Sequence, residues 1–323
     1  MRFIFYCSDN FQLMDLSGPA DVFAIANIIE GKPLFDLVYV SEHGGLIKSN
    51  SGVLIESIAI HEIKLELKDV IFLINGLDIS QPNSAKVSTF IQQAYLRVEN
   101  ICTVCTGLFI LANALPHECF SATTHWFYLD DIKRMYPKIT LNQRAPYVQD
   151  NKLWSSAGIS TAIDMALDIL ELKMGRELTQ HVAMAMVLPN RRKQSDSQLT
   201  FHLKMQFECS NSKWEDLILW IQENIDKDLS TEQLSAFMAM SPRNFTRRCK
   251  TEFSLTPKKL VDKVRIETAV ALLRDTKQTI SYIAHRCGFK REENMQRAFV
   301  RHFGESPKEF RRTKNSCFNT SEH

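Results

Sequence analysis

The sequence predicts two domains, an α/β domain followed by an all-α domain with two helix-turn-helix units. Three observations predict them: short apolar runs alternate with helical patterns up to residue 188, the charge changes sign near residue 190, and residues 229–262 resemble residues 280–312. The length of 323 residues suits two domains, because a domain usually holds roughly 100–200 residues. We expect the domains at 1–189 and 213–315, with a linker over 190–212 and a tail over 316–323.

The first domain is expected to contain a mostly parallel sheet with helices on both faces. Buried strands are predicted at Phe3–Cys7, Leu37–Val40, Val70–Ile74 and Ile101–Val104, and helices at about 18–30, 83–98, 106–115, 160–174 and 176–188. Continuous apolar strands separated by helices are typical of this architecture.

Composition excludes several classes of protein. No apolar run approaches the roughly 18 residues of a membrane helix, and the first apolar run ends at Ser8, too early for a signal peptide. We therefore expect a cytoplasmic chain with no membrane partner.

Eight cysteines in this length form no disulfide framework, and Cys102 and Cys105 should point to opposite faces of a strand. Neither a metal nor a cofactor is expected.

The charge is divided unevenly along the chain. Residues 1–190 hold 14 Lys and Arg against 20 Asp and Glu, whereas residues 191–323 hold 25 against 17. A basic second half behind an acidic first half predicts nucleic-acid binding by the second half alone, although a solvated basic face would have the same composition.

Two matching segments make up the second domain. Phe245, Arg247, Phe253 and Pro257 return fifty positions later as Met295, Arg297, Phe303 and Pro307. Each segment is predicted to form a short helix, a tight turn and a longer helix, with small residues at the crossing (Ser235, Ala284) and in the turn (Ala239, Gly288). Ser230 and Ser241 are expected to cap helices, with Pro242 at a first helical position.

The longer helix of each unit should turn its polar side outward. Phe245, Cys249 and Phe253 share one face, as do Met295, Phe299 and Phe303. The outward residues predicted to contact DNA are Arg243, Asn244, Arg247, Lys250, Arg291, Asn294, Gln296, Arg297 and Arg301. Arg suits guanine and Asn suits adenine, and two such helices would reach successive major grooves about one DNA turn apart.

Residues 214–314 resemble the DNA-binding domain of AraC/XylS-family regulators. The resemblance is carried by Ile283–Phe289, Phe299 and Phe303–Arg311. Lys290-Arg291 departs from the family pattern, which has a small or polar capping residue there. The contacts of the second recognition helix are therefore less well defined by the resemblance than its fold.

Cys105 is the residue most suggestive of a site in the first domain. It follows an apolar strand and opens a helix, and we expect the helix amides to lower its pKa. Such a strand-to-helix turn is called a nucleophile elbow. His125 and Trp126 are candidate neighbours, although a histidine in an apolar stretch more often packs in a core.

The first domain resembles the PfpI-type, class I glutamine amidotransferase-like domain of GlxA-family regulators, which implies a flavodoxin-like fold. The matching segments are Asp15–Phe23, Val104–Gly107, Ala122–Trp126, Ser155–Ser160 and Gln194–Gln198. The resemblance implies that Asp15 lies beside the cysteine. The candidate ligand pocket is Asp15, Gly76, Cys105, Thr106, His125, Trp126, Ser156 and Gly158.

Binding is expected at this pocket rather than catalysis. Asn75-Gly76-Leu77-Asp78 replaces the Pro-Gly-Gly of the superfamily, and losing one oxyanion donor costs about 100- to 1000-fold in rate. The amides before the helix at 160–174 could bind an anion or simply pack.

The expected function is that of a transcription regulator, an activator by its family. It would bind promoter DNA and respond to an amino-acid- or amine-derived metabolite. The resemblance also implies a homodimer formed through the N-terminal domain. The alternatives are a cysteine-dependent hydrolase or amidotransferase fused to a DNA-binding domain, and a redox sensor that uses Cys105.

Overall fold

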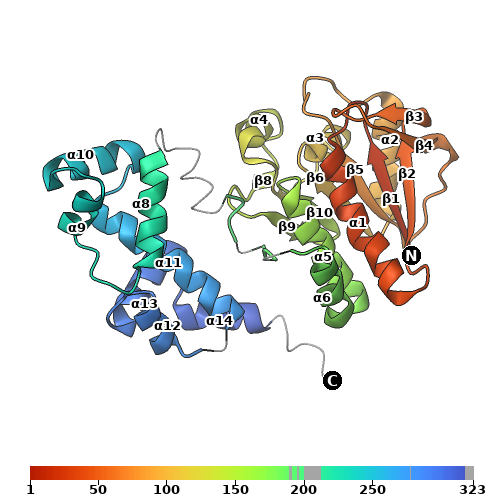
Figure 1. Cartoon of the computed structure of the whole chain (residues 1–323). Helices are drawn as coiled ribbons and strands as arrows, with labels where there is room; N and C mark the ends of the chain where they lie inside the picture. Colours follow the sequence, from red (N-terminus) through yellow and green to blue (C-terminus); the bar gives the residue numbers. More distant parts are fainter. Residues whose placement is uncertain (189–190, 195, 200–211, 277, 317–323) are drawn as a thin grey trace. The chain divides into compact units, whose positions relative to one another are not determined.

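The computed structural model describes residues 1–188, 191–194, 196–199, 212–276 and 278–316. The chain divides into two compact units, Met1–Gln198 and Leu199–His323 (Figure 1). The first is α/β and the second is all-helical, as predicted. Most of the expected linker and tail lies outside the described residues. Residues 191–194 and 196–198, which we expected in the linker, fall within the first unit, and Arg191 and Arg192 form ion pairs with it.

An eight-stranded sheet forms the centre of the first unit, in the order β3-β4-β2-β1-β5-β6-β10-β9. The strands are β1 Arg2–Cys7, β2 Asp36–Ser41, β3 Gly45–Lys48, β4 Leu54–Ala59, β5 Val70–Ile74, β6 Asn100–Val104, β9 Tyr147–Asp150 and β10 Leu153–Ser156. All neighbours pair in parallel except the two edge strands, β3 and β9. The prediction of a mostly parallel sheet is confirmed.

Helices cover both faces of this sheet. Phe3 and Phe5 of β1 pack in one core with α1 (Leu13–Glu30), α5 (Ser160–Met174) and α6 (Arg176–Ala185). Ile4 and Tyr6 point to the other face and pack with α2 (Ala85–Arg97), α3 (Gly107–Ala114) and α4 (Leu129–Met135). Successive residues of one strand therefore serve two cores.

Some elements differ from the prediction. Helix α1 begins five residues before the predicted start, because Gly18 does not interrupt the helix. A Cβ at Gly18 would lie 2.9 Å from Ile163 Cγ1 of α5. The glycine therefore permits close packing of the two helices. The sequence pattern missed β3, β4, β9, β10 and α4, as well as the short strands β7 (Ser121–Ala122) and β8 (Thr140–Leu141). These elements are short and of mixed polarity, so they lack a clear periodic signal.

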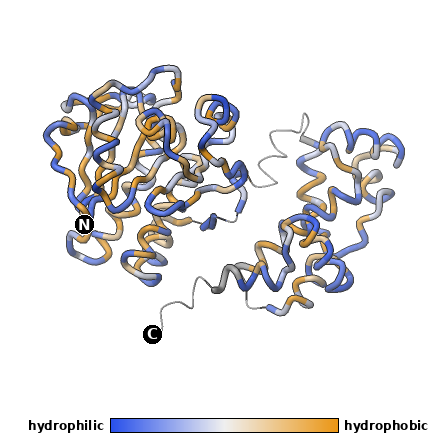
Figure 2. The backbone as a smooth tube through the Cα atoms, turned by 180° about the vertical axis from the view of Figure 1, so that it is seen from behind, coloured by the Kyte–Doolittle hydropathy of each residue, from blue (hydrophilic) through white to orange (hydrophobic). Residues whose placement is uncertain are grey.

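The second unit is built around one long helix, α11 (Pro257–Asp275). Around it lie α8 Ser212–Glu223, α9 Thr231–Phe237, α10 Pro242–Phe253, α12 Ile280–Arg286, α13 Glu292–Phe303 and α14 Pro307–Ser316. The first half of α11 packs with α8, α9 and α10, and its second half packs with α12, α13 and α14. Each helix-turn-helix unit therefore has its own apolar core on a shared helix. In Figure 2 hydrophobic and hydrophilic stretches alternate along the tube of this unit.

The described residues contain neither a membrane-spanning helix nor a disulfide. None of the helices there has the length and apolar character needed to span a bilayer. The six cysteines that the structure describes are free thiols.

Candidate elbow site and nucleic-acid interface

Cys105 lies in a sharp turn between β6 and α3. Its φ of +53° is rare for a residue with a side chain, and strain of this kind often marks a functional site. Three hydrogen bonds hold the turn: the Cys105 amide donates to Ser156 O (3.0 Å), Thr124 Oγ1 donates to Cys105 O (2.7 Å), and Thr106 Oγ1 donates to Gly76 O (2.7 Å). The predicted elbow is present.

Asp15 is fully buried against this turn. Its Oδ1 accepts a hydrogen bond from the Ile159 amide at 2.7 Å. Burial raises the pKa of Asp15 to about 6, although the Ile159 amide and the nearby Cys105 thiol oppose the shift. The Ile159 amide is one of those we expected to be open to an anion, and the chain's own carboxylate already occupies it.

The Cys105 thiol does not have the lowered pKa that its position predicted. Burial and the negative charge of Asp15 raise the pKa of Cys105, and the hydrogen bonds of Thr106 only partly oppose them. The helix amides do act in the expected direction, but desolvation outweighs them. The thiol is therefore neutral near pH 7.

Gly158 lies directly against the sulfur. Its φ is +114°, and a Cβ at this position would lie 3.0 Å from Cys105 Sγ. Asp15, Cys105, Thr106, Ser156 and Gly158 thus come together around the elbow, and Gly76 joins them through Thr106.

His125 and Trp126 form a separate cluster. Among the described residues, His125 has ring contacts with Trp126 and Tyr128, and its Nδ1 accepts a hydrogen bond from the Phe127 amide at 3.3 Å. Burial lowers the pKa of His125, and 43% of Trp126 is exposed. Tyr128, which sequence reasoning missed, extends this cluster toward the elbow, since its OH donates to Leu77 O (2.9 Å), next to Gly76, and burial raises its pKa.

A cavity of about 640 Å³ opens beside the elbow at the ends of β1, β2 and β5. Gly76 is the member of the candidate pocket that lines it. Asp9, Glu42 and Asp78 also line it, and none of the described lining residues is Lys or Arg. The charges of Glu42 and Asp9 add to burial in raising the pKa of Tyr6, another lining residue. The cavity is therefore an electronegative one.

The first helix-turn-helix unit has the predicted caps. Ser230 caps α9 in a capping box with Gln233, and Ser241 Oγ accepts from the Asn244 amide at 3.3 Å. Pro242 occupies the first turn of α10. Phe245, Cys249 and Phe253 are buried, as predicted. Arg243, Arg247 and Lys250 are exposed along the opposite face, and Arg247 donates to Asn244 Oδ1 at 3.1 Å.

The second unit repeats this arrangement with one difference at its turn. Met295 and Phe299 are buried, and Gln296, Arg297 and Arg301 are exposed. Arg297 donates to Asn294 Oδ1 at 2.8 Å, which matches the pair in the first unit. Arg291, however, is the N-cap residue of α13 and makes no capping hydrogen bond with its side chain.

Two acidic residues at the start of α13 were absent from the predicted interface. Glu292 and Glu293 are exposed in its first turn, next to Asn294 and Arg297. The fifty-residue repeat aligns Glu293 with Arg243, and this alignment could have identified it. Besides accepting from Arg297, Asn294 donates through Nδ2 to Phe289 O at 3.1 Å, whereas Gln296 and Arg301 are exposed on the same helix.

Comparison with known families matches the two parts separately. Residues 1–172 match the model of the DJ-1/PfpI family, and residues 234–313 match the model of a helix-turn-helix domain.

Relatives that span both parts are similar over nearly the whole chain. The HTH-type transcriptional regulator GbdR of Pseudomonas aeruginosa is 23% identical over 95% of this chain and 83% of its own length. The regulator CdhR of the same species is 23% identical over 96% and 91%, and GlxA of Rhizobium meliloti is 24% identical over 95% and 94%.

Solved structures show the same fold. A ThiJ/PfpI family protein from Pseudomonas syringae has a TM-score of 0.53 at 18% identity, and covers 73% of this chain and 89% of its own. An AraC family transcriptional regulator from Pseudomonas putida has a TM-score of 0.50 at 17% identity, and covers 57% and 98%.

Proposed function

The chain belongs to the DJ-1/PfpI family and carries an AraC-type helix-turn-helix domain behind that α/β fold, and from this premise we propose how it works. It is a DNA-binding transcription regulator. In our proposal both recognition helices read promoter DNA, and the α/β domain binds a small metabolite without converting it. Binding of the metabolite promotes activation of the target promoters.

One observation carries the DNA-reading part of the proposal. The same Asn–Arg pair, Asn244–Arg247 and Asn294–Arg297, recurs on both recognition helices fifty residues apart, with both arginines exposed. Asn and Arg are the side chains that read adenine and guanine in the major groove. A solvated face has no need to repeat this pair.

Chromatin immunoprecipitation with the chain and with an Arg247→Ala/Arg297→Ala double variant tests this part. Discrete enriched sites that disappear in the variant support it. Equal enrichment by the two proteins refutes the assignment of the reading residues. A reporter placed behind an enriched site tests activation, since its expression should rise with the chain and not with the variant.

The effector is proposed to be a small amine or amino-acid derivative. The cavity beside the elbow presents Asp9, Glu42 and Asp78, and the described lining contains His43 but neither Lys nor Arg. A cation is therefore favoured over an anion. Gly76 lines the cavity and accepts the hydrogen bond of Thr106, so an occupant of the cavity adjoins the elbow.

Thermal unfolding of the full chain with a panel of amines and matched carboxylates tests this assignment. Amines should raise the unfolding temperature of the wild type, because a ligand of the native state stabilises it by mass action. Glu42→Gln should lose the shift. Stabilisation by the carboxylates alone contradicts the proposed class.

The elbow is proposed to bind and not to catalyse. The thiol has a raised pKa, the Ile159 amide is engaged by Asp15, and the partners of His125 lie in its own cluster. The chain should therefore show no Cys105-dependent turnover of amides or esters. Turnover that Cys105→Ser abolishes would establish the enzyme alternative instead.

Self-association through the α/β domain is also proposed, on the family resemblance. Light scattering of the purified chain should give twice the monomer mass. A monomer at micromolar concentration contradicts it.

A further inference from the structure

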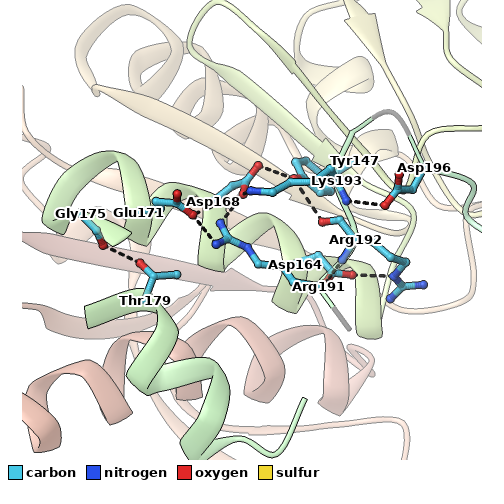
Figure 3. A network of polar contacts seen from close by, with 10 residues as sticks. All are labelled: Tyr147, Asp164, Asp168, Glu171, Gly175, Thr179, Arg191, Arg192, Lys193 and Asp196. Atoms are coloured by element: carbon cyan, nitrogen blue, oxygen red, sulfur yellow. Dashed lines mark hydrogen bonds and ion pairs between the residues drawn. The ribbon is translucent and has the colours of Figure 1, made fainter. Parts of the chain in front are cut away.

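A short basic segment is fixed across one end of the α/β domain. It is the stretch of residues 191–194 and 196–198, here called the strap, and it belongs to the first unit immediately before the second unit begins at Leu199. Figure 3 shows Arg191, Arg192 and Lys193 turned toward the acidic face of α5.

The basic end of the strap is anchored by ion pairs. Arg191 contacts Asp168 and Glu171, and Lys193 contacts Asp168 at 2.8 Å. Arg192 Nε donates to Asp164 Oδ2 at 2.7 Å, and its amide donates to Asp164 Oδ1 at 2.9 Å. The Asp164 side chain is only 5% exposed, so solvent screens this pair weakly.

The other end of the strap reaches the elbow. Gln198 is buried, and its Nε2 donates to Thr123 Oγ1 (2.9 Å) and to Thr124 O (3.0 Å). Thr124 in turn holds the Cys105 carbonyl through its hydroxyl. A single side chain therefore separates the strap from the strained turn.

A second route joins the strap to Asp15. Arg192 donates to Ser160 Oγ at 2.7 Å, and Ser160 follows Ile159, whose amide Asp15 accepts. Ile159 has a strained φ of +27°. The strap thus contacts both segments that flank the sulfur, one through Gln198 and one through Arg192.

Some buried polar atoms of the docked strap lack a hydrogen bond. Among the described groups, Gln198 Oε1 and Arg191 Nε are buried without a hydrogen-bond partner. An unmet buried polar group opposes burial, so the docked state is held by a balance of contacts. Docking of this kind can respond to a small rearrangement at the elbow.

We propose that the strap couples the elbow to the DNA-binding domain, with Gln198 as its sensing residue. An effector that shifts Thr124 or Ile159 changes the docking of the strap, which precedes the second unit in the sequence. This inference rests on the proposed function. By linkage the coupling is reciprocal, so DNA bound to the second unit must alter the elbow through the same contacts.

Alkylation of Cys105 by iodoacetamide, followed by mass spectrometry in the full chain, tests the proposal. The exposed Cys119 is the internal reference, and a random-sequence duplex at low salt is the DNA probe. In the wild type, a saturating concentration of duplex should change the rate of Cys105 alkylation by about fivefold or more. Fivefold is the lower end of typical allosteric couplings. Gln198→Ala should speed alkylation of Cys105 without DNA and abolish the effect of DNA. The matched control Gln149→Ala, in the exposed part of β9, should behave as the wild type.

A variant at the opposite end of the strap separates coupling from local damage. Asp168→Asn should accelerate tryptic cleavage after residues 191–193 and also speed Cys105 alkylation. Faster cleavage with unchanged alkylation would overturn the proposal, as would a Gln198→Ala protein that responds to DNA like the wild type. Fluorescence anisotropy of the duplex is recorded in parallel. Failure of the wild type to bind DNA defeats the proposed function itself, whereas intact binding with unchanged alkylation defeats only the coupling.

Discussion

The two helix-turn-helix units share a fold but differ in how their recognition helices are held and charged. Both turns use a residue with positive φ, Ala239 at +53° and Gly288 at +73°. Helix α10 then begins at a Ser241 cap, whereas α13 begins at Arg291 without a side-chain cap. The repeat also places Glu293 where the first unit has Arg243, and Val300 where it has Lys250.

From this difference we propose that one fold serves two kinds of contact. The first recognition helix presents Lys250 beside its proposed reading residues, and such a cation suits an added phosphate contact. The second unit depends on its neighbour: Gly288 packs against Ile225 O, and Arg265 of α11 donates to that carbonyl (3.3 Å) and to Lys227 O (3.0 Å). The glutamates in the first turn of α13 interact favourably with the helix dipole. In our proposal this turn faces base edges.

The largest expected effect is on the turn of the second unit. In Gly288→Ala the new Cβ would meet Ile225 O at 2.0 Å, so the free energy of unfolding should fall by about 2–4 kcal/mol. Ala239→Gly at the matching turn should change it by less than about 1 kcal/mol, since that backbone already accommodates a side chain. Calorimetry of the full chain measures both. Equal losses would mean that the two turns are held alike.

DNA affinity should respond with opposite signs at matching positions. Arg243→Ala should weaken promoter binding by about 1–3 kcal/mol, the usual cost of one specific contact, and Arg297→Ala should also weaken it. Glu293→Ala removes a negative charge and should strengthen binding to random-sequence DNA. Titrations by anisotropy measure these changes. Unchanged affinity in both Arg variants would show that the recognition helices are misplaced.

Substitutions at the two N-cap positions should change the stability of the chain in opposite directions. Ser241→Ala removes a capping hydrogen bond and should cost about 1 kcal/mol of stability, whereas Arg291→Ser supplies a cap and should add about 0.5–1 kcal/mol. Chemical denaturation is the measurement. A loss of stability in Arg291→Ser would show that the arginine already fulfils a structural role there.

The smallest effect concerns salt. Lys250→Ala should reduce the slope of log affinity against log salt by about one, because one phosphate contact and its released counterion are lost. Val300→Ala at the matching position of α13 should leave the slope unchanged. Similar slopes in all three proteins would remove Lys250 from the phosphate contacts.

Strongly periodic features could be predicted from the sequence, and contacts between distant segments could not. Strand β5 and helix α5 have the predicted bounds, and Ser230 and Ser241 cap the helices they were expected to cap. These features depend on nearby residues. Strand β10, in contrast, is four residues long with two serines, and its pairing with β6 and β9 makes it a strand.

The elbow shows the same limit. The turn at Cys105 follows from the local pattern, but its pKa depends on burial and on Asp15, ninety positions earlier. The partner of the Ile159 amide is likewise Asp15, and the strap pairs Arg192 with Asp164 on α5. No local pattern identifies such partners, so the sequence predicts a linker where the strap lies.

We propose that both recognition helices of this regulator read DNA. Selection of bound duplexes from a random library with the full chain tests this proposal most directly. We expect two sequence elements about one helical turn apart, roughly 10 base pairs, with Arg243→Ala erasing preference at one and Arg297→Ala at the other. Enrichment of a single element, or loss of both elements in either variant, would contradict it.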